Sequence, residues 1–145
     1  MKALLIQGAN MEYLGFREPE LYGRTTLDQL SELLRADAAH LEIDLDIRVT
    51  NLEGEAIGWI YEAARGDADI LIMNPAGFLY AGYALRDCLK AVELPYIEVH
   101  MTNIDRRGMK SVVATECVGM ISGFGVRSYR LALRAAADIM TEKAQ

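Results

Sequence analysis

The chain has 145 residues, which suits one domain of ordinary size with a single core. Its formal net charge of −6 argues against nucleic-acid binding, because that function needs a basic stripe and Arg106, Arg107 and Lys110 form only a small local group. The apolar run Ala3–Ile6 is too short for a secretory signal, and no stretch approaches the roughly 18 apolar residues that span a bilayer, so we expect a cytoplasmic protein with no membrane partner.

The first predicted strand, Ala3–Gln7, is a short apolar run that ends at a glycine, as expected of a buried parallel strand. The next segment, 9–25, is much longer than the roughly 2–6 residues that usually join a strand to a helix. We therefore predict that it closes over a ligand as a lid. Thr26 and Gln29 then have the spacing of a capping box, and leucines at helical spacing predict a helix behind it.

The middle of the chain predicts two further strands with a helix between them. Residues 43–49 alternate between aliphatic and charged side chains, which indicates a strand at the sheet edge with one buried face. Asn51 is predicted to cap the helix that follows. The apolar run Ile70–Met73 predicts a central strand covered on both faces, which ends at the break over 74–77. The remaining predicted elements are a helix around 84–89, strands at 95–101 and 117–122, and a terminal helix after 123–125.

Strands and helices that alternate in this way predict an α/β fold. We expect one domain over 1–145, a three-layer sandwich around a five-stranded parallel sheet in the flavodoxin-like order 2-1-3-4-5. Ligands of such sheets bind beyond the carboxyl ends of the strands, near the point where the strand order reverses. Asn10, Asn74, His100 and Thr102 all follow predicted strand ends, so we expect them to meet at one rim.

Two residues at this rim suggest acid–base chemistry. The imidazole of His100 could exchange a proton near neutral pH; the alternative is a structural histidine bonded to the backbone. Tyr22 follows Arg17 in the predicted lid, and a guanidinium close to a phenol favours the phenolate, which could then serve as a base. The alternative pairs Arg17 with Glu18 or Glu20 and leaves Tyr22 as a packing residue.

No metal or nucleotide pattern stands out. The chain has only two histidines, and no Cys/His spacing suits zinc, so we expect metal-free chemistry. Cys88 and Cys117 are expected to be reduced thiols. The segment Gly123-Phe124-Gly125 suits a tight turn, because it follows the last strand and lacks the third glycine and the acidic residue of a dinucleotide site.

Several motifs extend over nearly the whole chain: Gly8-x-Asn10, Leu14-Gly15-x-Arg17-Glu18-Pro19-x-x-Tyr22-Gly23, Asn51-x-Glu53-Gly54-Glu55, Asn74-Pro75, Ala84-Leu85-Arg86-Asp87, Glu98-Val99-His100-x-x-Asn103 and Gly123-Phe124-Gly125. Together they resemble the type II 3-dehydroquinate dehydratases. The resemblance implies a lyase that removes water from 3-dehydroquinate through an enolate to give 3-dehydroshikimate, without metal or organic cofactor. It also implies a homo-oligomer, usually a dodecamer of trimers. A biosynthetic role in the shikimate pathway and a catabolic role in quinate breakdown both stay open.

The resemblance also implies residue roles. Tyr22 would take the proton α to the ketone while Arg17 holds the phenolate. Asn10 would position a water that stabilises the enolate oxygen, and His100 would protonate the departing hydroxyl. The remaining implied substrate contacts are Asn74, Tyr80, Asp87, Met101, Thr102, Arg107 and Lys110. Of these, Asp87 would reach a neighbouring subunit's site, and Lys110 would replace an arginine.

The chain departs from the family pattern where the ring hydroxyls would be bound. Tyr80 stands in place of a histidine, and the chain is a few residues short after Arg107, so the arginine that clamps the diol has only Lys110 as a substitute. A site built to hydrogen-bond hydroxyls rejects analogues that lack them. Two alternatives therefore stay open: a diverged lyase acting on a related cyclic hydroxy-keto carboxylate, and a noncatalytic flavodoxin-like binding or assembly module.

Overall fold

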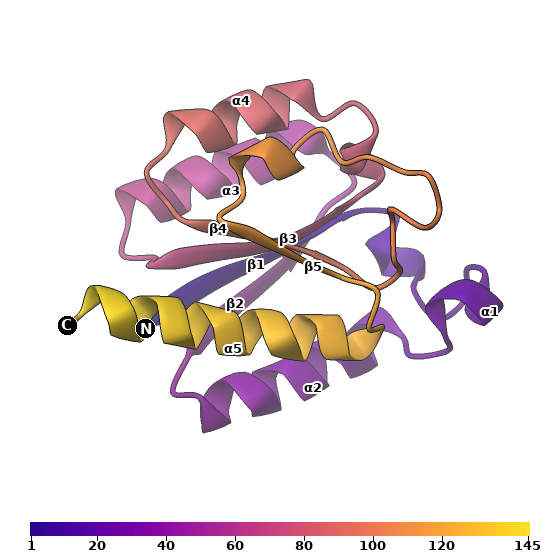
Figure 1. Cartoon of the computed structure of the whole chain (residues 1–145), viewed down its shortest axis with the longest axis horizontal. Helices are drawn as coiled ribbons and strands as arrows, with labels where there is room; N and C mark the ends of the chain where they lie inside the picture. Colours follow the sequence, from indigo (N-terminus) through magenta and orange to yellow (C-terminus); the bar gives the residue numbers. More distant parts are fainter.

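Five parallel strands form the middle layer of the molecule (Figure 1). A computed structural model describes residues 1–145. The strands are β1 (Lys2–Ala9), β2 (Asp44–Val49), β3 (Ile70–Ala76), β4 (Tyr96–His100) and β5 (Gly119–Ser122). They lie in the order β2-β1-β3-β4-β5, every neighbouring pair is parallel, and β3 is central. The predicted flavodoxin-like order and the edge position of β2 are confirmed.

Helices cover both faces of the sheet (Figure 1). One face packs against α2 (Leu27–His40) and α5 (Val126–Lys143), and the other against α3 (Glu53–Arg65) and α4 (Tyr83–Ala91). Because side chains alternate along a strand, Leu5 belongs to the first core and Ile6 to the second. The shorter elements are α1 (Pro19–Tyr22) and the single turns η1 (Met11–Tyr13), η2 (Gly77–Leu79) and η3 (Ala114–Glu116). None of the helices combines the length and apolar character that a membrane crossing requires.

The first long helix begins as the sequence predicts. The Thr26 hydroxyl accepts a hydrogen bond from the Gln29 backbone at 3.2 Å, and the Gln29 side chain accepts one from the Thr26 backbone at 3.0 Å. Asn51, in contrast, does not cap α3, whose N-cap residue is Leu52 and has no side-chain cap. Its amide is already used in a contact with the segment after β1, described below.

β3 runs three residues further than the apolar pattern predicts, through Asn74-Pro75-Ala76. The pairing of β3 with β4 stops at Met73 and Glu98, whereas its pairing with β1 continues to Ala76. Pro75 therefore sits on a free edge, where its missing N–H costs no ladder hydrogen bond. Because the two strands stop pairing there, the sheet opens between β3 and β4 at its carboxyl end.

The residue that precedes the predicted lid by one position, Gly8, lies directly against this extension of β3. Gly8 approaches Pro75 so closely that a Cβ on Gly8 would lie 2.1 Å from the proline carbonyl oxygen. Only glycine allows this approach. Segment 9–25 then continues through η1 and α1, so it contains short helical turns.

Candidate active site

A pocket lies beyond the carboxyl ends of β1, β3 and β4, at the rim where the sequence places the site. The cavity measures about 90 Å³. All but two of the predicted site residues line it: Asn10, Arg17, Tyr22, Asn74, Tyr80, His100, Met101, Thr102 and Arg107. Met11, Leu14, Leu79, Ile104 and Met109 supply apolar wall. Polar groups from four separate segments thus converge on one apolar-walled cavity, which is the usual character of a small-molecule site.

The other two predicted residues lie outside this lining. Lys110 is exposed and does not line the pocket, and Arg107 is the cation contributed by that part of the chain. Asp87 is exposed on α4, outside the pocket of its own chain, so its predicted contact with a neighbouring subunit stays a prediction.

Two guanidinium groups lie close to the ring of Tyr22. The guanidinium carbon of Arg17 lies 5.3 Å from the ring centre, and that of Arg107 lies 5.5 Å from it. Arg17 also has its Nε 3.5 Å from a Glu18 carboxylate oxygen, so this side chain contacts both the phenol ring and a neighbouring carboxylate. Arg107 donates a hydrogen bond to the Thr102 hydroxyl at 2.9 Å. Two positive charges of the pocket thus lie next to one phenol ring.

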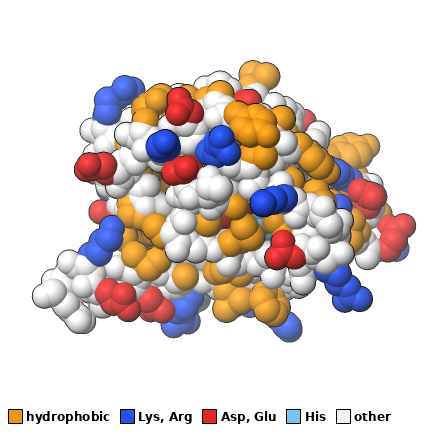
Figure 2. All heavy atoms as spheres, turned by 45° about the horizontal axis from the view of Figure 1, so that its top comes forward, with side chains coloured by type: hydrophobic (Ala, Val, Ile, Leu, Met, Phe, Trp, Pro, Cys, Tyr) orange, Lys and Arg blue, Asp and Glu red, His pale blue; other side chains and the backbone are white.

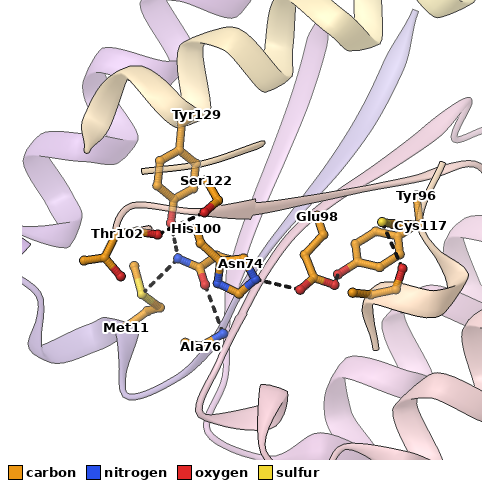
Figure 3. A network of polar contacts seen from close by, with 11 residues as sticks. Met11, Asn74, Ala76, Tyr96, Glu98, His100, Thr102, Cys117, Ser122 and Tyr129 are labelled. Carbon is orange, nitrogen blue, oxygen red and sulfur yellow. Dashed lines mark hydrogen bonds and ion pairs between the residues drawn. The ribbon is translucent and has the colours of Figure 1, made fainter. Parts of the chain in front are cut away.

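His100 is held from behind by a carboxylate (Figure 3). Its Nε2 lies 2.6 Å from Glu98 Oε1, and both side chains are buried. His100 Nδ1 has no hydrogen-bond partner within the chain. It is also not among the fully buried polar atoms that lack a partner, which are Gln7 Nε2 and Ser111 Oγ, so solvent or a ligand can reach it. The imidazole therefore presents Nδ1 for exchange with a ligand. Glu98 forms part of a sequence motif, but its role emerges only from this contact; a carboxylate two residues before a histidine on one strand is the signal that points to it.

A second polar network fixes Asn74 (Figure 3). Its amide nitrogen donates to the Tyr129 hydroxyl at 2.8 Å, and its amide oxygen accepts from the Ala76 backbone at 3.0 Å. Tyr129 in turn donates to Gln7 Oε1 at 2.6 Å. Burial raises the pKa of Tyr129 well above its ordinary range, so this phenol stays protonated and continues to donate. Asn74 thus presents its amide to the pocket in one orientation.

Asn10 is held by its backbone. Its φ of 77° lies in the left-handed region, where asparagine is among the better tolerated residues. Its N–H donates to the Asn51 side-chain oxygen at 2.8 Å, and the Asn51 amide nitrogen donates to Glu12 at 2.5 Å. Asn51 thereby connects the start of α3 to the start of segment 9–25.

Nothing in the chain gathers three or more His, Cys, Asp or Glu side chains close enough to hold a metal ion. The pocket instead offers a phenol beside two cations, an imidazole backed by a carboxylate, and two asparagine amides. This set can remove one proton and deliver another on a small anionic molecule.

Comparison with known proteins places these features in one family. The family model for "Dehydroquinase class II" matches residues 1–137. A protein of Idiomarina loihiensis named 3-dehydroquinate dehydratase is 44% identical over 93% of this chain and 91% of its own length. One of Thermus thermophilus with the same name is 41% identical over 94% of both chains.

Solved structures agree. The crystal structure of the type II dehydroquinase from Propionibacterium acnes is similar with a TM-score of 0.90 and 36% identity, covering 94% of this chain and 96% of the other. A 3-dehydroquinate dehydratase-like protein from Bifidobacterium longum is similar with a TM-score of 0.74 and 29% identity, covering 97% and 98% of the two chains. Sequence, fold and pocket together show that this chain belongs to the class II dehydroquinase family.

Proposed function

We propose that this protein is a hydro-lyase that removes water from 3-dehydroquinate to give 3-dehydroshikimate. The observation that supports the proposal is that a candidate base and a candidate acid lie in one cavity. Two guanidinium groups lie close to the Tyr22 ring, and His100 contacts a buried carboxylate. Elimination beside a ketone needs a base, a stabiliser for the enolate and an acid.

In the first step the Tyr22 phenolate takes the proton on the carbon next to the ketone. The electron pair of that C–H bond moves into the carbonyl, which becomes an enolate. Arg17 and Arg107 hold the phenolate before transfer, and Asn10 positions a water that donates a hydrogen bond to the enolate oxygen. The left-handed backbone at Asn10, held by Asn51, supports this role because it fixes where the side chain starts.

In the second step the enolate collapses and the C–O bond of the β-hydroxyl breaks. The imidazolium of His100 gives its Nδ1 proton to the departing oxygen, which leaves as water, and the new double bond is conjugated with the ketone. Glu98 stabilises the imidazolium before transfer, because a carboxylate 2.6 Å from Nε2 favours the charged ring.

The remaining pocket groups bind the substrate. Thr102 and the backbone of Met101 hold its carboxylate, and Arg107 adds positive charge there through its contact with the Thr102 hydroxyl. Asn74 and Tyr80 face the ring hydroxyls. Asp87 approaches the site of a neighbouring subunit, and Lys110 serves the diol edge only if the segment after Arg107 moves towards the pocket.

We propose further that segment 9–25 acts as the lid, and that the chain works in the cytoplasm as a homo-oligomer built from trimers. Exposed hydrophobic side chains support assembly. Val118, Met120 and Phe124, around the free edge strand β5, are 61%, 41% and 62% exposed. Such an edge is usually covered. On the face in Figure 2, apolar patches likewise interrupt the charged surface.

The test is incubation of the purified chain with 3-dehydroquinate while the absorbance of the conjugated enone is followed. Wild-type protein should produce the absorbance, and Tyr22→Phe should abolish it. Tyr13→Phe is the matched control, because Tyr13 belongs to the same lid segment but does not line the cavity and makes no side-chain hydrogen bond. A flat trace for the wild type at high enzyme concentration would reject this substrate.

One observation favours a second candidate. Tyr80 is 66% exposed at the pocket mouth in place of the family's histidine, and Lys110 lies outside the lining. A diverged lyase acting on a cyclic hydroxy-keto carboxylate without the diol would combine a flat trace on 3-dehydroquinate with turnover of the simpler ring. Tyr22→Phe would abolish that turnover too, which separates this candidate from a noncatalytic module.

A further inference from the structure

Three polar side chains alternate along β4 and point to the same face of the sheet (Figure 3). Tyr96 donates its hydroxyl proton to Glu98 Oε2 at 2.7 Å, and the other carboxylate oxygen faces His100 Nε2 at 2.6 Å. The line runs from the core between the sheet and α3/α4 to the pocket, where only His100 is part of the lining. Tyr96 is thus connected to the pocket without touching it.

A buried carboxylate needs both of its oxygens satisfied. Glu98 is 0% exposed, and an ionised group in an apolar core is costly unless it is paired and hydrogen-bonded. The His100 imidazole is the partner of one oxygen, Oε1. The Tyr96 hydroxyl is the only side-chain donor to the other. Burial, together with the charge of Glu98, raises the pKa of Tyr96 well above its ordinary range, so the phenol keeps the proton that it donates.

We propose that Tyr96 is a positioning residue for the acid of the reaction: its hydroxyl holds the Glu98 carboxylate ionised and turned towards His100, and so keeps the proton on the imidazole. The proposal rests on the proposed role of His100 as the acid. A phenylalanine would fill the same space, so the hydroxyl itself is what the proposal concerns.

The neighbouring titratable groups do not replace this hydroxyl. Cys117, on the segment before β5, faces Tyr96 and Glu98, but its thiol donates to the Ala114 carbonyl at 3.1 Å. Burial and the charge of Glu98 raise the pKa of the Cys117 thiol, so it stays neutral. The other titratable groups near His100 reach it only through the pocket that they line together: Tyr22, Arg17 and Arg107.

Removing the hydroxyl would leave Glu98 Oε2 buried and unpaired. The carboxylate would then bind a proton more strongly, and the proton that Glu98 and His100 share would move towards Glu98. A neutral imidazole is a much weaker acid than an imidazolium, so the elimination step would slow. Substrate binding would change little, because Tyr96 is outside the pocket lining.

The direct test is imidazole NMR of Tyr96→Phe without substrate. The chain has only two histidines, and the exposed His40 on α2 serves as an internal reference. In Tyr96→Phe the ring-nitrogen signals of His100 and the pH at which they titrate should move, while those of His40 stay in place. Unchanged His100 signals in a folded variant would overturn the proposal, since they would show that the hydroxyl only fills the core.

Kinetics give the second readout. We expect kcat for Tyr96→Phe to fall about tenfold, with KM within about twofold of wild type. Cys117→Ala, which alters the packing beside Tyr96 without touching the hydrogen bond, should leave the His100 titration unchanged. A matching shift of His100 in Cys117→Ala would assign the effect to packing and overturn the proposal.

If Tyr96→Phe does not fold, the Tyr96 hydroxyl proton of the wild-type protein is measured by NMR to test the proposal. A hydroxyl proton held in a buried hydrogen bond should exchange slowly enough to give a signal with a cross-peak to the Tyr96 ring. Absence of that signal, with other buried protons visible, would count against the proposal. The NMR arms need no turnover, so protein inactive on 3-dehydroquinate would reject the proposed function and leave this inference to be judged by the His100 spectra.

Discussion

The guanidinium carbon of Arg107 lies 5.5 Å from the ring centre of Tyr22, although the two residues come from different segments at the pocket. This contact gives the proposed base a cation from the segment after β4 as well as one from its own segment, 9–25. Arg107 is itself anchored, because its Nη1 donates to the Thr102 hydroxyl. Segment 9–25 and the segment after β4 therefore meet at the phenol.

We expect Arg107→Ala to lower kcat at least tenfold, because the phenolate loses a cation and substrate loses charge next to its carboxylate. Arg107→Lys should recover only part of this, since an ammonium cannot reproduce the planar contact. Steady-state kinetics on 3-dehydroquinate would measure both. Arg106→Ala is the matched control, because Arg106 is the exposed neighbour and does not line the pocket; an equal loss there would contradict a specific role for Arg107.

Tyr129→Phe should weaken both stability and catalysis. It removes the hydroxyl that connects Gln7 to Asn74 and leaves two buried amide groups without that partner. The free energy of unfolding should fall by about 1–3 kcal/mol, measured by urea denaturation. KM should rise as Asn74 loses its fixed orientation. Tyr83→Phe provides the control: its hydroxyl is on an exposed side chain and makes no hydrogen bond, so wild-type stability is expected.

High pH should unfold the protein through its buried phenols. Burial raises the pKa of Tyr96 and Tyr129 in the folded state above the ordinary value of 10.0. Unfolded phenols release their protons near that pH while folded ones retain them. The stabilisation is thus complete below pH 10 and falls as pH rises towards the folded-state pKa. Ultraviolet titration of tyrosinate should show that, of the seven tyrosines, these two ionise last and together with unfolding.

The variant Tyr129→Phe should remove one of the two late-ionising groups and no earlier one. Ionisation of both phenols well before the loss of helical circular dichroism would contradict their burial.

Gly8→Ala should be among the most damaging single substitutions in the chain. The new methyl carbon would lie 2.1 Å from the Pro75 carbonyl oxygen, so β1 and β3 would have to separate. We expect a loss of at least about 3 kcal/mol in the free energy of unfolding. Gly58→Ala is the control, because that glycine lies inside α3 with nothing within 4 Å; it should stabilise by roughly 0.5–1 kcal/mol. Thermal and urea unfolding of both variants would measure the difference.

Local sequence patterns predicted most of the fold. The alternation at 43–49 and the unbroken run Ile70–Met73 placed one strand at the edge and the other at the centre, because the period of burial reports how many faces of a strand are covered. The Thr26–Gln29 capping box was predictable because its four groups lie within one turn. The rim position of Asn10 and His100 followed from the parallel sheet alone.

What the sequence could not predict were contacts between distant segments. Asn51 has the residue type of a helix cap, yet its side chain accepts a hydrogen bond from the Asn10 backbone and donates one to Glu12, both on a segment distant in the sequence. The link from Tyr129 to Asn74 joins α5 to β3 and has no local signal. The extension of β3 through Pro75 rests on pairing with β1 that continues after the pairing with β4 has ended, and residues 74–76 alone do not reveal this.

The proposed acid and its supporting groups occupy alternate positions of one strand, whereas Tyr22 and Arg17 belong to segment 9–25, outside the sheet. The proposed acid thus depends on the geometry of one strand, whereas the proposed base belongs to a segment that can be exchanged without changing that strand. Relatives that differ in the length or make-up of segment 9–25 could acquire new ring preferences without rebuilding the proton donor, and a chimaera that swaps only this segment is the natural starting point for redesign.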